Sequence, residues 1–249
     1  MLDTAIEAAR AATKVTLKYF KNQPKVQYKP DASPVTIADK TAEKVIRGII
    51  NQRFPDHGII GEEFPAEKPE ARFKWIIDPI DGTRDFIRGM KLWSTFIALS
   101  DNGKIVASVA YYPTTDEMFT AQKGRGTRLN GKKIHVSKIK DINYAYLSHG
   151  QITRFEASGY FKNFMNVART VNSKRNFGSY SLAQLLNGHV DIYLEPGGGI
   201  WDFATPSLLV EEAGGKFTNF AGQKKLDSGN AIMTNGVLHT KVLKLFNQK

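Results

Sequence analysis

The segment Trp75–Phe86, WIIDPIDGTRDF, decides the fold because a hydrophobic run stops abruptly in acidic and turn-forming residues. Asp78 and Asp81 lie three positions apart, with Pro79 between them. Proline has no N–H group to donate to a sheet ladder, so we expect the strand to end there and the chain to turn. The turn should project both carboxylates from the end of a sheet rather than bury them.

The residues that follow this turn favour an anion site beside the carboxylates. Gly82 lets the backbone approach a ligand closely, and Thr83 adds a hydroxyl group. If a short helix begins near Arg84, the N–H groups of Gly82 and Thr83 point outward toward an anion. Carboxylates beside an anion conflict unless a cation lies between them, and Mg²⁺ commonly bridges protein carboxylates and substrate phosphate. An ordinary strand-ending turn with Asp at its turn and cap positions is the alternative.

Two further segments place acidic side chains where an apolar run ends or a helix begins. IIGEE at 59–63 ends in Glu62 and Glu63, and taken alone it is typical of a solvated strand end. WDFATP at 201–206 puts Asp202 just before a helix, where an ordinary N-cap is the alternative. A metal cluster requires these acidic ends to converge, and their spacing in the sequence leaves that question open.

Composition limits the class of protein. The chain has 249 residues, of which 41% are hydrophobic, enough for one or two domains. It has no cysteine, which excludes disulfides and thiolate metal sites and favours a reducing cytoplasm. The formal charge of +11 comes from scattered Lys and Arg residues, which indicate a solvated surface rather than a nucleic-acid footprint. No apolar run approaches the roughly 20 residues that a membrane helix needs.

Apolar periodicity predicts both helices and strands. Helices are expected over 4–20 and within 33–54, where apolar residues recur at helical spacing. A stretch rich in strands is expected over 92–137, with hairpin turns at 101–103 and 130–131. After it, strands and helices alternate to the end of the chain. The pattern therefore predicts a mixed α/β or α+β protein.

A polar segment at 137–143 is the best candidate for a domain boundary. We predict an N-terminal α+β domain over 1–139 that carries most of the metal ligands. A C-terminal α/β domain over 140–249 then carries Asp202 and the substrate contacts. Each of these halves contains a sheet of its own.

Three motifs together resemble the inositol monophosphatase family of Mg²⁺-dependent, lithium-sensitive phosphatases that act on small molecules. They are GEE at 61–63, WIIDPIDGT at 75–83, and WD at 201–202 leading into EEAGG at 211–215. They stand in the family's order, and the surrounding pattern fits over nearly the whole chain. The resemblance implies a layered αβαβα sandwich, often assembled as a homodimer. The partner that it implies is a small-molecule phosphate ester, with no nucleic acid and no membrane.

The resemblance also implies a set of metal ligands. Glu62, Asp78 and the Ile80 carbonyl would hold one Mg²⁺ ion, and Asp78, Asp81 and Asp202 would hold a second. A third, weaker ion would use Glu62 and water molecules. The cofactor expected from the resemblance is therefore Mg²⁺, with two to three ions.

The resemblance assigns the catalytic and substrate roles as well. Asp39 would pair with Thr83 to orient and deprotonate the attacking water. The N–H groups of Gly82 and Thr83 would take phosphate oxygens, and Glu195 would contact the alcohol portion of the substrate. No Cys or His nucleophile is required. The histidines show no paired spacing, so surface or core positions are expected for all of them: His57, His135, His149, His189 and His239.

Two stretches favour one branch of the family, the histidinol-phosphate phosphatases. They are FIRGMKLWSTFIAL at 86–99 and RNFGSYSLAQLLNGHVDIYLEP at 175–196. Hydrolysis of histidinol phosphate to histidinol is therefore expected, with inositol monophosphate as the alternative substrate. Nucleotide 3′-phosphatase and fructose-bisphosphatase activities are further alternatives. Gly197–Gly199 depart from both branches, because they leave a bare and flexible wall.

A basic binding protein with a degenerate active site is the alternative that is not an enzyme. It would bind nucleic acid or inositol phospholipid headgroups through its positive charge. Such a protein should have lost metal ligands, whereas every expected carboxylate is present.

Overall fold

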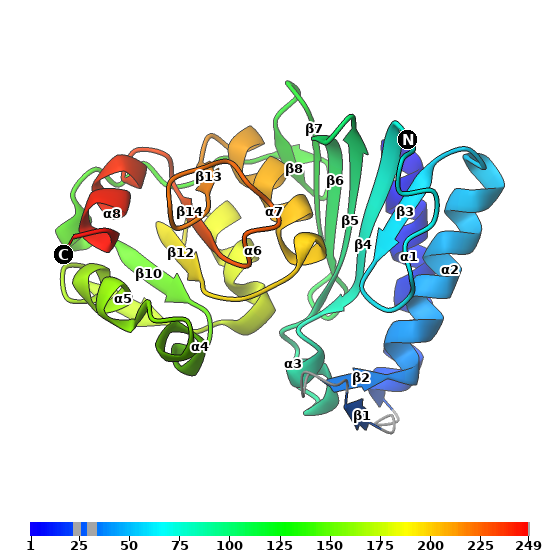
Figure 1. Ribbon diagram of the computed structural model, residues 1–249, viewed down its shortest axis with the longest axis horizontal. Coiled ribbons are helices and arrows are strands. Elements are labelled where there is room, and N and C mark those ends of the chain that lie inside the picture. The colour runs from blue at the N-terminus through cyan, green and yellow to red at the C-terminus, as the bar shows by residue number, and fades with distance from the viewer. Residues whose placement is uncertain (22–25, 29–33, 249) are drawn as a thin grey trace.

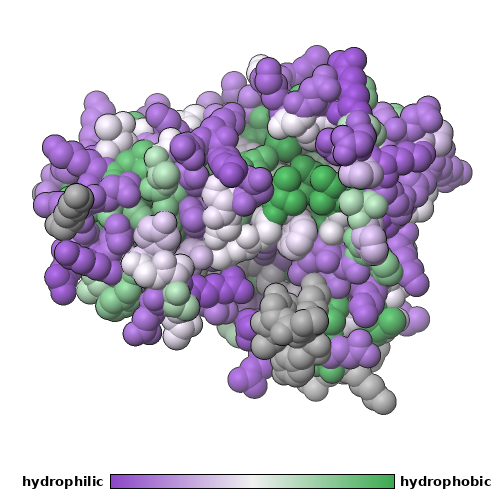
Figure 2. All heavy atoms as spheres, in the orientation of Figure 1, coloured by the Kyte–Doolittle hydropathy of each residue, from purple (hydrophilic) through white to green (hydrophobic). Residues whose placement is uncertain are grey.

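The computed structural model describes residues 1–21, 26–28 and 34–248. Helices and sheets alternate in five layers along the long axis of the molecule (Figure 1). The expected αβαβα sandwich, an α+β fold, is therefore confirmed. Hydrophilic residues cover most of the face shown in Figure 2, in keeping with the charged composition. None of the helices in the described ranges is long and apolar enough to cross a membrane.

The larger sheet comes from the first half of the chain, and only its first two strands are parallel. φ is positive at Asn102 and Gly103 in one of its hairpin turns, and at Asn130 and Gly131 in another. Paired left-handed residues suit tight two-residue turns, so both expected hairpins are confirmed. In spatial order the strands are β3 (Gly58–Gly61), β4 (Phe73–Asp81), β5 (Ser94–Asp101), β6 (Lys104–Tyr112), β7 (Glu117–Gln122), β8 (Thr127–Leu129) and β9 (Lys132–Lys133).

Two long helices, α1 (Leu2–Lys21) and α2 (Ile37–Arg53), cover the outer face of this sheet (Figure 1). A capping box starts α2. The Thr36 hydroxyl accepts a hydrogen bond from the Ala38 N–H at 3.0 Å, and Asp39 Oδ2 accepts the Thr36 N–H at 2.8 Å. The cap fixes Asp39 in the first turn of α2, on the buried side of the helix.

The smaller sheet comes from the second half of the chain and contains both parallel and antiparallel pairs. Its spatial order is β11 (Ser173–Arg175), β10 (Tyr146–His149), β12 (Ile192–Glu195), β14 (Ala231–Thr234) and β13 (Lys216–Thr218). The remaining elements are the pair β1 (Val26–Tyr28) and β2 (Pro34–Thr36), the helices α3 (Thr83–Ile87), α4 (Ile152–Ala157), α5 (Phe161–Ala168), α6 (Ser181–Leu186), α7 (Ile200–Glu212) and α8 (His239–Phe246), and 3₁₀ turns at Ile142–Tyr144 and Gly178–Tyr180.

Both faces of the smaller sheet are buried, because alternate residues of a strand point to opposite sides. Ile192 and Leu194 of β12 belong to the core cluster shared with α4, α5 and α8, which form the outer layer. Tyr193 belongs instead to the cluster that contains α6 and α7, the layer between the sheets. Helix α7 also packs against β6 of the larger sheet, so it joins the two halves of the chain. The division into domains at 1–139 and 140–249 stays a prediction.

Strand β4 differs from expectation between Asp78 and Asp81. It does not end at Asp78 but continues to Asp81, with an irregular register between the two residues. The irregularity accommodates Pro79, whose carbonyl accepts the Thr95 hydroxyl of β5 at 2.9 Å. Asp78 is therefore only 2% exposed, and the expectation that both carboxylates project from a sheet end is wrong for this residue.

Candidate active site

A pocket of about 390 Å³ opens between the two sheets. Its walls come from the end of β4, the start of α3, the start of α7 and the end of β12. All the sequence-predicted site residues except Asp39 line this pocket: Glu62, Asp78, Ile80, Asp81, Gly82, Thr83, Glu195 and Asp202. The fold therefore brings together residues from both halves of the chain.

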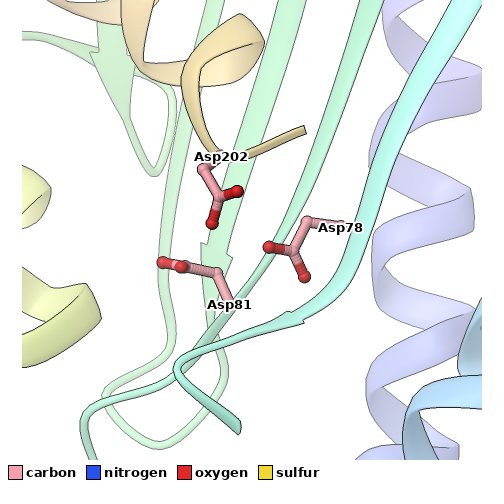
Figure 3. Close-up of side chains that lie close together, drawn as sticks. All are labelled: Asp78, Asp81 and Asp202. Carbon is pink, nitrogen blue, oxygen red and sulfur yellow. The ribbon is translucent and has the colours of Figure 1, made fainter. Parts of the chain in front are cut away.

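Three carboxylates converge at one side of the pocket. Asp78 and Asp81 come from β4, and Asp202 comes from the first turn of α7. One carboxylate oxygen from each lies within 4.8 Å of the others, and in Figure 3 the carboxylates of Asp78 and Asp202 turn toward each other, with the side chain of Asp81 beside them. The convergence that the sequence left open is therefore present. The placement of Asp202 before the helix is corrected, since α7 begins at Ile200.

The charge on this cluster fits a bound cation. Oδ1 of Asp78 is buried and has no hydrogen-bond partner among the described residues. Burial raises the pKa of Asp78 well above its usual range, and the nearby charges of Glu62, Asp81 and Asp202 raise it further. A buried carboxylate that faces other carboxylates is unfavourable unless a cation compensates it. An all-oxygen donor set is the one that Mg²⁺ prefers.

Neighbouring groups hold the other two carboxylates in place. Asp202 Oδ2 accepts the Gly199 N–H at 2.6 Å, which closes a capping box at the start of α7. Asp81 Oδ2 accepts the hydroxyl groups of Ser179 and Ser94. In both Asp81 and Asp202, Oδ2 accepts these hydrogen bonds, and Oδ1 has no hydrogen-bond partner within the described ranges. The bonds orient the carboxylates and leave an oxygen of each for a ligand.

The two serines are site residues that the sequence argument missed. Ser179 lies in the 3₁₀ turn at Gly178–Tyr180, and Ser94 begins β5, so the second half of the chain helps to orient Asp81. Their hydroxyl groups lie 2.8 Å apart. A single serine outside any motif carries no sequence signal for such a role.

Asp39 and Thr83 meet behind the pocket wall. The Thr83 hydroxyl lies 3.3 Å from Asp39 Oδ1 and 3.1 Å from the Ile80 carbonyl oxygen, and both are acceptors. Asp39 is fully buried, and burial raises its pKa to about 6, although hydrogen bonds from Thr36 oppose the shift. A carboxylate with a pKa near neutrality beside a hydroxyl group is suited to accept a proton.

Gly82 occupies a position that only glycine fits. Its φ is +90°, and it precedes α3, which begins at Thr83 close to where the sequence placed it. A Cβ atom here would lie 2.9 Å from the Leu92 carbonyl oxygen and 2.9 Å from Cβ of Ser179. The backbone of Gly82 and Thr83 can therefore form the pocket wall without an intervening side chain.

Glu62 and Glu195 complete the acidic lining. Glu62 lies one residue beyond β3, and its N–H group donates to the Ile77 carbonyl of β4 at 3.2 Å. Glu195 ends β12 and accepts the Tyr193 hydroxyl at 2.8 Å. Burial raises the pKa of Glu195 to about 7. Glu62 contributes to the charge around Asp78 and Asp202, whereas Glu195 comes from the smaller sheet.

The three-glycine wall is not bare, which corrects the sequence expectation. A Cβ atom at Gly197 would lie 2.8 Å from Nη1 of Arg154, and one at Gly199 would lie 2.6 Å from the Trp201 ring. The glycines therefore let a guanidinium group and an indole lie against the backbone. Arg154 lines the pocket, and its guanidinium has no hydrogen bond or ion pair with any described residue. No motif in the sequence marks Arg154 as a pocket residue.

None of the five histidines lines the pocket, as expected. His135 and His189 are exposed, and His149 and His239 are buried. His57 is partly buried and accepts the Trp75 indole N–H at Nδ1 at 3.1 Å. The site therefore offers carboxylates, hydroxyl groups and backbone groups, and no imidazole.

Glu195→Gln is expected to stabilise the metal-free protein at pH 8 by at most about 3 kcal/mol. The folded-state pKa of about 7 lies above the ordinary 4.5, so the stability that the protonated form contributes is present below pH 4.5 and lost as the pH rises through 7. Urea denaturation from pH 4 to pH 8 measures the effect. The exposed pair Glu211 and Lys224 provides the control Glu211→Gln. An equal change at pH 4 and pH 8 would contradict the burial argument.

Fold and site together define the class of protein. A layered αβαβα sandwich with converging carboxylates at a pocket between its sheets is the arrangement of a metal-dependent phosphatase. The model of the inositol monophosphatase family matches residues 1–249. The chain belongs to this family, whose members are Mg²⁺-dependent phosphatases.

Individual relatives agree with this assignment. The chain is 34% identical to a histidinol-phosphatase from Mycobacterium tuberculosis over 229 residues, which is 90% of this chain and 88% of the relative. It is 36% identical to Nus factor SuhB from Vibrio cholerae over 94% of this chain and 91% of the relative. Among solved structures, the IMPase from Thermotoga maritima superposes with a TM-score of 0.89 at 30% identity, covering 99% of this chain and 96% of that one.

Proposed function

We propose that the protein hydrolyses histidinol phosphate to histidinol, with Mg²⁺ held at the acidic cluster. The observation that carries the proposal is the pocket itself, which has the cluster of Asp78, Asp81 and Asp202 on one wall and Glu195 on another. A carboxylate away from the site that would bind the phosphate group is a suitable partner for the ammonium group of histidinol phosphate. The relatives named as histidinol-phosphatases support the same substrate.

The ligand set for the metal follows from the donors in the pocket. Glu62, Asp78, Asp81, Asp202 and the Ile80 carbonyl would hold the ions. When bound, Mg²⁺ lowers the pKa of a coordinated water and compensates negative charge on the phosphoryl group. The carboxylates themselves supply the fixed geometry, because Ser94, Ser179 and the Gly199 N–H orient two of them.

Asp39 and Thr83 would prepare the attacking water. When the Thr83 hydroxyl donates to Asp39, its lone pairs face away from the carboxylate and can accept a hydrogen bond from water. The water proton then passes through Thr83 to Asp39, whose raised pKa suits it to receive the proton. The N–H groups of Gly82 and Thr83 would hold phosphate oxygens. Positioning and electrostatics carry most of the catalysis in phosphoryl transfer.

Inositol monophosphate is the second candidate substrate, and Arg154 is the observation that favours it. Burial raises the pKa of Glu195, and the charge of the nearby Arg154 guanidinium partly opposes this rise. A positive charge there weakens the attraction of the pocket for an ammonium group. Its N–H groups also suit the hydroxyl oxygens of a polyol.

Phosphate release at matched concentrations of histidinol phosphate and inositol 1-phosphate tests the proposal, with Mg²⁺ present. We expect kcat/KM to be at least about tenfold higher for histidinol phosphate, a difference of about 1.4 kcal/mol in transition-state binding. A preference for inositol 1-phosphate would overturn the assignment of histidinol phosphate as the substrate and would leave the proposed metal site intact. Release from neither compound would overturn both candidate substrates.

Arg154→Gln is expected to raise the preference for histidinol phosphate over inositol 1-phosphate by roughly fivefold. The substitution removes a positive charge near the ammonium of the substrate, and two unit charges about 4 Å apart that are screened by water interact by about 1 kcal/mol, which corresponds to about fivefold. The ratio of kcat/KM values for the two substrates measures it. Arg175→Gln provides a control, because Arg175 is exposed and does not line the pocket. An unchanged ratio would rule out Arg154 as a selectivity residue.

We also propose the remaining expectations from the family. They are two to three bound ions, inhibition by lithium at high Mg²⁺, a homodimer and a cytoplasmic location. The bacterial relatives support the location. Addition of LiCl tests the expected inhibition by lithium, and sedimentation tests the expected homodimer.

A further inference from the structure

We propose that Arg47 is a positioning residue for the metal site, which it serves by fixing the loop that carries Glu62. This inference rests on the proposed role of Glu62 as a metal ligand. Arg47 lies in α2, outside the pocket, and only 6% of it is exposed. Its role follows from what its guanidinium contacts.

The Arg47 guanidinium spans the segment that follows Glu62. Its Nη2 donates to the carbonyl oxygens of Phe64 at 3.1 Å and Pro65 at 3.2 Å. Its Nη1 donates to Glu67 Oε1 at 2.7 Å. A planar fork of donors is suited to hold several acceptors in one fixed arrangement. One side chain therefore holds three positions of the loop between β3 and β4.

Glu43 contacts the residues on both sides of Glu62. Its Oε1 accepts Nε of Arg47 at 2.8 Å, and its Oε2 accepts the Glu63 N–H at 2.8 Å. The side chain is fully buried and lies against Gly61, where a Cβ atom would meet the carboxylate. Glu62 is thus flanked by a close contact at Gly61 and a hydrogen bond at Glu63. The backbone on either side of the metal ligand is fixed by this ion pair.

Helix α2 connects this ion pair to the catalytic water. Asp39, Glu43 and Arg47 follow one another at intervals of four residues, so they share one face of the helix. Asp39 contacts Thr83 at the start of that face, while Glu43 and Arg47 contact the loop further along. A buried ion pair contributes little net stability, and its value here is the conformation that it specifies. The same helix therefore positions a water-orienting residue and a metal ligand.

Arg47→Lys is the variant that tests the proposal. Lysine keeps the positive charge beside Glu43 but loses the fork that reaches two carbonyl groups. We expect the Kd of the metal-free protein for Mg²⁺, measured by calorimetry without substrate, to rise about tenfold. KM for the phosphate ester at saturating Mg²⁺ should stay within twofold of wild type. Hydrogen exchange at the Glu63 amide should become faster.

Arg53→Lys is the matched control. Arg53 lies on the same helix and pairs with Glu7 at 2.6 Å, away from the loop. Its Mg²⁺ affinity is expected to stay within twofold of wild type. If Arg47→Lys does not fold, the double variant Glu43→Gln/Arg47→Met removes both buried charges, and we expect the same loss of Mg²⁺ affinity.

The outcomes separate this inference from the proposed function. Unchanged Mg²⁺ affinity in a folded Arg47 variant would overturn the role of Arg47 alone. A wild-type protein that binds Mg²⁺ but releases no phosphate would overturn the proposed function alone. A wild-type protein that binds no Mg²⁺ would overturn both.

Discussion

Asp78→Asn is expected to lower phosphate release at least about a thousandfold, comparable to removing a group that stabilises charge in the transition state. The variant should also be more stable than wild type when no metal is present. Burial, followed by the charges of Glu62, Asp81 and Asp202, raises the pKa of Asp78 above the ordinary 3.8. The stability that protonated Asp78 contributes is therefore fully present below pH 3.8 and is lost as the pH rises through the raised pKa. Asparagine does not ionise, so the variant does not lose this stability at high pH.

Melting temperatures in EDTA at pH 8, together with phosphate release in Mg²⁺, measure the two effects. Asp191→Asn is the control for a buried aspartate of another kind. Asp191 accepts the Tyr146 N–H at 2.7 Å and a bond from the Ser137 hydroxyl, so its replacement should lower stability. A metal-free Asp78→Asn protein that melts below wild type would contradict the account of the cluster as a cation site.

Thr83→Ala is expected to lower kcat by about two to three orders of magnitude and to leave the Mg²⁺ affinity within a few-fold of wild type. The reason is that the Thr83 hydroxyl bonds to Asp39 and to the Ile80 carbonyl, and its side chain is not part of the acidic cluster. Calorimetric Mg²⁺ binding and single-turnover phosphate release separate the two quantities.

Thr83→Ser is the matched control, since it keeps the hydroxyl group and removes only a methyl group. We expect it to retain most of the turnover. Equal losses of Mg²⁺ affinity and kcat in Thr83→Ala would show that Thr83 supports the metal site rather than the water. Full activity in Thr83→Ala would remove the hydroxyl group from the mechanism.

Features that depend on local chemistry could be predicted from the sequence. The hairpin turns at Asn102–Gly103 and Asn130–Gly131 follow from residues that tolerate positive φ. The position of Gly82 before a helix follows from the glycine itself. The metal-type acidic motif was recognisable because its carboxylates stand close together in the sequence.

Features that depend on distant contacts could not be predicted. β4 continues past Pro79 because Thr95 and Ser94 of the neighbouring strand bond to its irregular end. Arg154 fills the space over Gly197 only because the fold places α4 beside that loop. A sequence shows which residue types are present, whereas these contacts depend on which strands and helices become neighbours.

The most direct test of the account is phosphate release from histidinol phosphate and inositol 1-phosphate before and after removal of metal with EDTA. We predict release in Mg²⁺ from at least one of the two, loss of release after chelation, and recovery when excess Mg²⁺ is restored. Wild-type protein and Asp78→Asn should be compared in the same assay, and the variant should stay inactive throughout. Release that persists after chelation, or in Asp78→Asn at the wild-type rate, would contradict the claim that the carboxylate cluster works by holding metal.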